Sequence, residues 1–341
     1  MTESGTSTPP LPHAVRIAGT GSYLPERIMT NQDLERLVET SDEWITSRTG
    51  IRERRIARED EFTSHMASEA ARAALAQAGI TGSDIDLIIV ATITPDTLTP
   101  ATACYVQQQI GALKAVAFDV SAACSGFLYA MELARHSVGA GAFRNALIIG
   151  AEKLSAFVDW SDRNTCVLFG DGAGAAVLVP STNGGGRILS SQLGTDGAQA
   201  ELLNIPGGGS ACPVGALGAA GTAEKSATLT MQGREVFKHA VNAMRKAAAE
   251  GIAAAGLTIQ DIDLLIPHQA NLRIIDAIVE RLDFSREDVF INLDKYGNTS
   301  AAAVAIALDE AHREGRIQRG DRILLVAFGA GLTWASAVIE W

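Results

Sequence analysis

Apolar positions follow two different periods along this chain, and their alternation predicts an α/β fold. Short β-rich runs, among them 14–18 and 264–266, alternate with alanine-rich segments of helical period. Segment 64–78 is the clearest predicted helix, with Gly79 standing where a helix C-cap belongs. Its expected buried face consists of Met66, Ala70, Ala73, Ala74 and Leu75. Two further helices are expected over 31–38 and from about Met231 to Ala255.

The chain also repeats itself, weakly but in the same order. Segment 79–89 recurs as 256–266, each copy being the end of an alanine-rich helix, a turn and a strand. Segment 169–175 is echoed by 328–334. These repeats favour a duplicated βαβ domain with a site where the two halves meet. The alternative is that helix–turn–strand units of α/β proteins look alike by chance.

Length and composition narrow the class of protein. A chain of 341 residues suits two domains or one large duplicated fold. Only 20% of its residues are charged and 33 are glycine, which excludes a disordered acidic chain. We expect a disordered tail over 1–12, an N-terminal half over 13–180 and a C-terminal half over 181–341. A long surface loop is expected over 206–228.

Charge and targeting signals exclude several partners. The net charge of −11 should repel nucleic acid and anionic lipid. Neither an apolar run of about 18 residues nor a leader pattern is found, so we expect a cytoplasmic protein that does not enter a membrane. The four cysteines form no Cys-x-x-Cys pair and suit reduced thiols. Histidine and cysteine spacings match no zinc pattern, and the first glycine pair, Gly19 and Gly21, lacks the rest of a dinucleotide-binding motif. We expect neither a metal nor a cofactor.

Cys124 is the strongest chemical signal. It follows a strand over 115–120 that we expect to be buried, and it precedes a helix that begins near Phe127. At such a corner the helix dipole and free N–H groups favour thiolate over thiol, and the small neighbours leave room for a substrate. A small buried apolar side chain is the alternative, and it is the better interpretation for Cys104 and Cys166.

His268 and Asn298 are the candidate partners of the thiol. His268 follows the strand 264–266, at the carboxyl end where α/β folds place their sites, whereas the other histidines lie in the tail or in helical segments. Asn298 follows a glycine and precedes a run of small residues typical of a buried helix, where a helix N-cap is the alternative role. The hairpin at Gly329-Ala330-Gly331 could bring a backbone N–H close to a ligand, as an oxyanion hole requires.

Together these residues resemble the signature of β-ketoacyl-acyl-carrier-protein synthase III, the thiolase-fold condensing enzyme that initiates type II fatty acid synthesis. The resemblance runs from about Val15 to Trp341 and rests on four motifs, 122–126 (AACSG), 268–273 (HQANLR), 296–300 (YGNTS) and 328–334 (FGAGLTW). It implies a thiolase-like duplicated α/β fold, with five layers α-β-α-β-α, pseudo-twofold symmetry and two five-stranded halves. It also implies a homodimer.

The resemblance further implies a catalytic triad of Cys124, His268 and Asn298. Cys124 would accept an acyl group from acyl-coenzyme A, and His268 with Asn298 would bind the thioester carbonyl of malonyl-acyl-carrier-protein during decarboxylation. The N–H groups of Cys124 and Ala330 would hold the second oxyanion, although the family usually has glycine at the position of Ala330.

Binding roles are implied for a further set of side chains. Trp44, Arg48 and Arg163 match the family's adenine-binding residues of the coenzyme A site, and Lys238 and Arg273 match basic residues that meet the acidic carrier protein. Phe169 and Phe328 should wall the acyl pocket. Thr99 stands where some relatives carry phenylalanine at the dimer-contributed end of that pocket, which predicts room for primers longer than acetyl.

The sequence leaves two other functions open. A secondary-metabolism relative could prime a polyketide or act as an acyltransferase without decarboxylation, although such relatives often alter the His or Asn, and both are intact here. A non-catalytic acyl-coenzyme A binding protein belongs to a different class altogether.

Overall fold

The computed structural model describes residues 11–182, 185–213 and 227–341. Its helices are α1 (Asn31–Leu34), α2 (Asp42–Thr49), α3 (Thr63–Ala78), α4 (Thr102–Gln109), α5 (Gly126–Gly139), α6 (Gly233–Ala254), α7 (Leu272–Leu282), α8 (Leu293–Tyr296) and α9 (Ala302–Arg313). Its strands are β1 (Val15–Tyr23), β2 (Ile28–Thr30), β3 (Glu53–Arg55), β4 (Leu87–Ala91), β5 (Val116–Val120), β6 (Ala146–Glu152), β7 (Gly172–Pro180), β8 (Arg187–Thr195), β9 (Leu203–Asn204), β10 (Thr230–Met231), β11 (Leu264–Pro267), β12 (Arg322–Gly329) and β13 (Thr333–Glu340).

Two mixed sheets form the centre of the molecule. The first has the order β1-β7-β6-β4-β5, with β4 parallel to both β5 and β6. The second has the order β11-β12-β13-β8, with β11 and β12 parallel. The expectation of five strands in each half is wrong for the second sheet as described. Beside β11, the segment that would continue the sheet makes only a single parallel bridge, between Leu265 and Val289.

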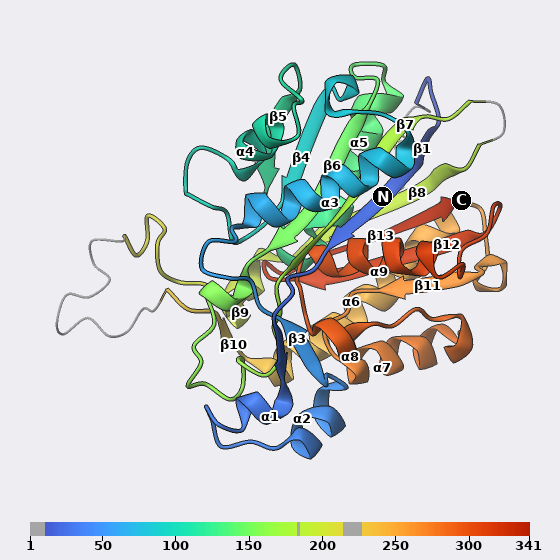
Figure 1. Ribbon diagram of the computed structural model, residues 1–341. Coiled ribbons are helices and arrows are strands. Elements are labelled where there is room, and N and C mark those ends of the chain that lie inside the picture. Colours follow the sequence, from blue (N-terminus) through green and yellow to red (C-terminus); the bar gives the residue numbers. More distant parts are fainter. Residues whose placement is uncertain (1–10, 183–184, 214–226) are drawn as a thin grey trace.

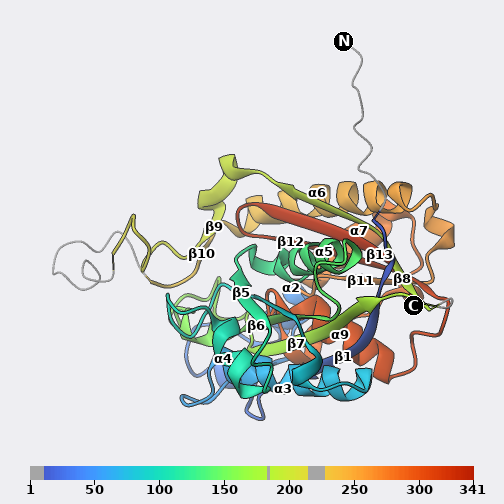
Figure 2. The same ribbon diagram turned by 90° about the horizontal axis from the view of Figure 1, so that it is seen from above.

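Helices separate and cover the two sheets, which confirms the expected five-layer α-β-α-β-α arrangement (Figures 1 and 2). Helix α3 packs on the outer face of the first sheet and α6 on the outer face of the second. Helices α5 and α9 lie between the sheets and share one apolar core with both. Burial of these small, alanine-rich helices from both sides explains their composition, since bulky side chains would hold the two sheets apart.

The sequence repeat corresponds to equivalent local structures. Both copies leave their alanine-rich helix through a glycine in the left-handed region, Gly79 at φ 69° and Gly256 at φ 71°. Each then forms a capping box in which a threonine N–H donates to an aspartate three residues later, Thr81 to Asp84 and Thr258 to Asp261. The strands that follow are β4 and β11. The duplication predicted from the sequence repeat is therefore present in the fold as two equivalent helix–turn–strand units.

Three local expectations are wrong in detail. The helix expected over 31–38 ends as α1 at Leu34, and Ala73 of α3 is exposed rather than part of the buried face. The strand expected to be buried, now β5, lies at the edge of its sheet, and Val116 is 52% exposed. The apolar side chains of β5 are typical of a strand buried within a sheet. However, no described element of the same chain pairs with its outer edge.

Candidate active site

The carboxyl ends of the parallel strands meet at one cavity of about 1240 Å³. Cys124 follows β5, Glu152 ends β6, His268 follows β11 and Ala330 follows β12. Parallel strands place such residues at one edge of a sheet, where α/β folds bind ligands. The cavity wall includes nine of the side chains singled out from the sequence, namely Trp44, Arg48, Cys124, Phe169, His268, Arg273, Asn298, Phe328 and Ala330.

Cys124 lies in a short 3-10 turn, Ala123–Ser125, that leads directly into α5. The loop after β12 packs against it so closely that a Cβ on Gly329 would lie 2.5 Å from the Cys124 nitrogen. Thr333 ties the same loop to the turn, because its hydroxyl donates to Ala122 O at 2.9 Å. The backbone N–H of Cys124 and the Ala330 loop are thereby brought to the same side of the cavity.

The expected thiolate is not the resting form of Cys124. Burial raises the pKa of its thiol to about 12, and the negative charge of Glu152 acts in the same direction. A hydrogen bond with the Ser300 side chain lowers that pKa but does not outweigh the burial. The prediction from the helix position was wrong because a local dipole competes with the loss of water around the whole side chain. Acylation therefore requires a proton acceptor.

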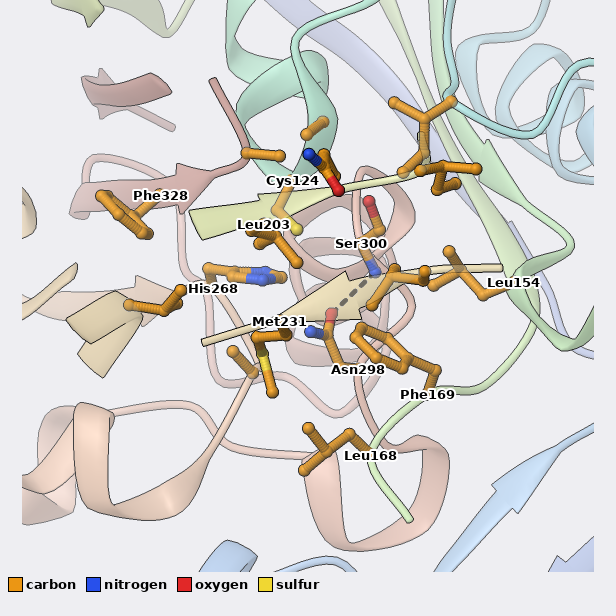
Figure 3. A pocket seen from close by; sticks show the side chains of 18 of the residues that line it. Cys124, Leu154, Leu168, Phe169, Leu203, Met231, His268, Asn298, Ser300 and Phe328 are labelled. Atoms are coloured by element: carbon orange, nitrogen blue, oxygen red, sulfur yellow. Dashed lines mark hydrogen bonds between the residues drawn. The ribbon is translucent and has the colours of Figure 1, made fainter. Parts of the chain in front are cut away.

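His268 lies beside the thiol in the cavity (Figure 3). Its backbone N–H donates to Val326 O at 2.8 Å, which fixes the residue at the end of β11. Burial lowers the pKa of the imidazole to about 4, so the ring is neutral at pH 7. Its Nδ1 is buried without a partner, which makes Nε2 the ring nitrogen available to a ligand and favours the tautomer with the proton on Nε2.

Asn298 is held by backbone and side chain together. Its N–H donates to Leu168 O and its carbonyl accepts from Gly170 N, at 2.8 and 3.1 Å. The side-chain Oδ1 accepts the Ser300 N–H at 2.9 Å, the bond drawn in Figure 3. Because the oxygen is occupied, the Nδ2 amide group remains as a donor for a ligand. Asn298 is not an N-cap, since α9 begins only at Ala302.

Two residues of the site were not singled out from the sequence. Glu152 is completely buried at the end of β6, and the Ser300 hydroxyl donates to its Oε1 at 3.1 Å. Ser300 is also a cavity residue in contact with the Cys124 thiol. A carboxylate directly after the buried run 146–151 was the available signal. The role of Ser300 gave no local signal in the sequence, because its partner Glu152 lies 148 residues away in the chain.

Trp44 and two arginines form one cluster at the mouth of the cavity. The guanidinium carbons of Arg48 and Arg163 lie 5.0 and 4.8 Å from the Trp44 ring centroid. Arg163 does not itself line the cavity, but its neighbour Asn164 does. Arg163 Nη1 also donates to Glu39 O at 2.9 Å, which holds it near the indole. Stacked guanidinium and indole planes are well suited to a planar heterocycle.

The remaining predicted side chains lie in different surroundings. Lys238 is exposed on α6 and does not line the cavity, whereas Arg273 is exposed at its wall. Thr99 is exposed and also outside the wall, although its neighbour Leu98 belongs to it. Cys166 is buried as expected, but Cys104 is exposed, so its interpretation as a core side chain was wrong.

Within the described ranges, the search for ligand clusters and spans gave two negative results. His, Cys, Asp and Glu side chains form no group of three that could hold a metal ion. The helices found there are all too short or too polar to cross a bilayer.

Comparison with protein families and known proteins identifies relatives over almost the whole chain. Residues 118–197 match the family model described as 3-oxoacyl-[acyl-carrier-protein] synthase III, and residues 252–341 match the model of that enzyme's C-terminal part. The β-ketoacyl-[acyl-carrier-protein] synthase III of Caldanaerobacter subterraneus is 58% identical over 96% of this chain and 98% of its own length. That of Desulfitobacterium hafniense is 52% identical with the same coverage.

Solved structures agree with these sequence relatives. The synthase III of Thermus thermophilus has a TM-score of 0.88 and 50% identity, covering 96% of this chain and 99% of its own. A priming β-ketosynthase from the R1128 polyketide pathway has a TM-score of 0.87 but only 37% identity, with 98% of both chains covered. Full-length identities above 50% to curated synthases favour the fatty acid enzyme over the polyketide alternative. The chain belongs to the β-ketoacyl-acyl-carrier-protein synthase III family.

Proposed function

We propose that Cys124, His268 and Asn298 carry out the initiating condensation of fatty acid synthesis on this chain. The reaction joins an acyl-coenzyme A primer to malonyl-acyl-carrier-protein, with loss of carbon dioxide, and gives a 3-oxoacyl-acyl-carrier-protein. One observation carries the assignment: a thiol from one half and an imidazole and a carboxamide from the other line the same cavity. This is the arrangement that a two-stage acyl transfer needs.

In the first stage the Cys124 sulfur attacks the primer thioester, and the acyl group moves to the enzyme. The developing oxyanion would be held by the N–H groups of Cys124 and Ala330. The close contact between Gly329 and the 3-10 turn that contains Cys124 brings these two groups together. Since both donors belong to the backbone, the alanine at 330 can replace the family's usual glycine without loss of a donor.

In the second stage His268 and Asn298 would bind the malonyl thioester oxygen. Decarboxylation moves negative charge onto that oxygen, so two fixed donors stabilise the enolate more than the substrate. A neutral imidazole with its proton on Nε2 and an amide with its oxygen already occupied are both suited to donate. The carbanion then attacks the acyl-Cys124 carbonyl and releases the sulfur.

The substrates would reach the cavity over two exposed surfaces. Arg48, Arg163 and Trp44 would bind the adenine of coenzyme A at the mouth. Lys238 and Arg273 would meet the carrier protein, because both are exposed beside the cavity on a chain that is otherwise acidic. Coenzyme A serves here as a substrate, and no cofactor is part of the proposal.

Replacing Trp44 by alanine should raise the KM for acyl-coenzyme A about tenfold and leave kcat nearly unchanged, because stacking energy of about 1–2 kcal/mol is lost from binding alone. Steady-state kinetics with varied acyl-coenzyme A measures this. Arg72→Ala, on the outer helix α3, is the matched control. An unchanged KM in both Trp44→Ala and Arg48→Ala would contradict the assignment.

We also propose a homodimer formed along the open edge of β5. The edge strand carries Val116 and Phe118, which are 52% and 38% exposed, and Leu98 nearby is 80% exposed. An unpaired apolar strand edge favours pairing with a second copy. Phe118 and Leu98 also line the cavity, so the partner's Thr99 segment would close its acyl end.

We further propose that the protein acts in the cytoplasm, where these substrates occur, because the free thiols of all four cysteines suit that compartment.

The reaction itself is tested with purified protein, malonyl-acyl-carrier-protein and acyl-coenzyme A primers of increasing length. We expect release of carbon dioxide and formation of 3-oxoacyl-carrier-protein, with turnover of primers longer than acetyl because Thr99 is small. Acyl transfer without carbon dioxide would indicate the acyltransferase alternative, and no transfer would indicate a binding protein. A strict preference for acetyl would refute the role given to Thr99.

A further inference from the structure

Glu152 is a buried carboxylate that the two-stage reaction does not use. Its side chain is 0% exposed, and none of the ion pairs among the described residues includes it. Instead it accepts hydrogen bonds from the hydroxyls of Thr92 and Thr94, at 3.2 and 2.6 Å, and from Ile93 N at 3.2 Å. Its remaining partner is the hydroxyl of Ser300 at 3.1 Å.

This environment leaves the carboxylate without a counter-charge. Burial raises the pKa of Glu152 to about 7, although each hydrogen bond lowers it. The neighbouring Lys153 turns away, since its Nζ donates to Arg58 O at 2.6 Å. Among the described residues, those that donate hydrogen bonds to Glu152 from the loop after β4 and from Ser300 offer only hydroxyl and N–H groups, and the negative charge of Glu152 acts on the Cys124 thiol. A buried, uncompensated carboxylate behind the wall of a reactive cavity is a candidate for a functional role.

Ser300 connects this carboxylate with the reacting residues. Its hydroxyl donates to Glu152 Oε1, its side chain interacts with the Cys124 thiol and lowers the pKa of that thiol, and its backbone N–H donates to Asn298 Oδ1. In Figure 3 Cys124, Ser300 and Asn298 surround the same space. Ser300 adopts a left-handed backbone conformation, φ 49°, which is unfavourable for a residue with a side chain. The surrounding structure therefore fixes where this hydroxyl lies.

We propose that Glu152 accepts the thiol proton of Cys124 through Ser300, as a step of the function proposed above. The thiol gives its proton to Ser300 Oγ, and Ser300 gives its own hydroxyl proton to Glu152 Oε1. The sulfur electron pair forms the bond to the primer carbonyl, the bond to the coenzyme A sulfur breaks, and that thiolate leaves and takes a proton from water. When the carbanion later releases the Cys124 sulfur, the stored proton returns from Glu152 by the same route.

His268 lines the cavity beside Cys124 and is the alternative base, but it is less suited to this task. Its pKa is lowered to about 4 by burial, so it holds a proton poorly at pH 7. An acceptor works best when its pKa lies near the working pH, which is the condition of Glu152. Separate groups for the two stages also leave the neutral imidazole free to donate to the malonyl thioester.

The test is single-turnover acylation of the intact protein by acetyl-coenzyme A between pH 5.5 and 8.5, followed as release of coenzyme A. In the native protein the rate should rise with pH through about 7, because only ionised Glu152 accepts a proton. Glu152→Gln keeps the shape but cannot accept a proton, so acylation should fall about 100-fold and the pH dependence should flatten. Glu152→Asp should recover part of the rate.

Ser300→Ala removes the connecting hydroxyl but keeps the N–H that orients Asn298, so it should slow acylation as Glu152→Gln does and spare malonyl decarboxylation. Asp171→Asn is the matched control, a second buried carboxylate bound by Ser155 and Ala57 without a link to Cys124. It should retain the native pH dependence.

Three outcomes would overturn the relay. The first is a native acylation rate in both Glu152→Gln and Ser300→Ala, and the second is a native pH dependence of acylation in both variants. Either result would show that the thiol proton does not pass through Ser300 to Glu152. Equal loss of acylation and decarboxylation would indicate a purely structural role and also reject it. Failure of the native protein to acylate at all would instead reject the proposed function.

Discussion

Replacing Cys124 by alanine is expected to abolish both self-acylation and condensation, with a fall in turnover on the order of 10⁴-fold or more. The sulfur forms the covalent intermediate, and no other described thiol lines the cavity. Radiolabelled acyl-coenzyme A followed by peptide mapping measures the result directly. In the native protein the label should be retained on the peptide that contains Cys124.

Cys104→Ala provides the control for this experiment, because that thiol is exposed and lies outside the cavity. It should acylate and condense at the native rate. Label that persists in Cys124→Ala would show that another group accepts the acyl chain, and the two-stage scheme would then be wrong. The substitution is small and the turn with its N-cap already contains Ala122 and Ala123, so the fold should survive it.

The second large effect is expected at His268 and Asn298. Alanine at either position should lower malonyl decarboxylation by about 10²–10³-fold, the usual result of removing one donor to an oxyanion. Self-acylation should remain, because neither side chain takes the thiol proton in the scheme proposed here. Release of labelled carbon dioxide and single-turnover acylation, measured on the same preparations, separate the two stages.

Asn298→Asp tests the geometry more finely. The carboxylate can still accept the Ser300 N–H but offers no donor to the thioester oxygen, so decarboxylation should fall as in the alanine variant. Gln77→Ala, near the second, smaller cavity on another part of the surface, is the control. Normal condensation by His268→Ala or Asn298→Ala would refute the division of roles.

The residues that could be predicted were those with local signals. Cys124 and His268 each follow a strand, and the end of a parallel strand is a recognisable place for a reactive group. The repeat of a helix, a glycine, a capping box and a strand indicated a duplicated fold, because each of those features involves neighbours in the chain. Features of this kind can be recognised in the sequence without any knowledge of how the elements pack.

The wrong expectations concerned properties set by distant residues. An apolar strand looks the same in sequence whether a helix, another strand or a second molecule covers it, so β5 was not recognised as an edge. The thiol pKa was misjudged because its main cause is the enclosure of the side chain by several distant segments. The second sheet has one strand fewer than expected, because the segment beside β11 pairs with it only through the single bridge between Leu265 and Val289.

The α/β class, the duplication, the family resemblance and the order of the reactive residues along the chain could all be inferred from the sequence. The protonated resting state of the thiol, the orientation of the Asn298 amide and the position of Glu152 next to Ser300 became visible only in the folded structure. The physical reason is that periodicity and turn chemistry depend on near neighbours. Desolvation and hydrogen-bond direction depend on atoms that only folding brings together, here from segments 148 residues apart.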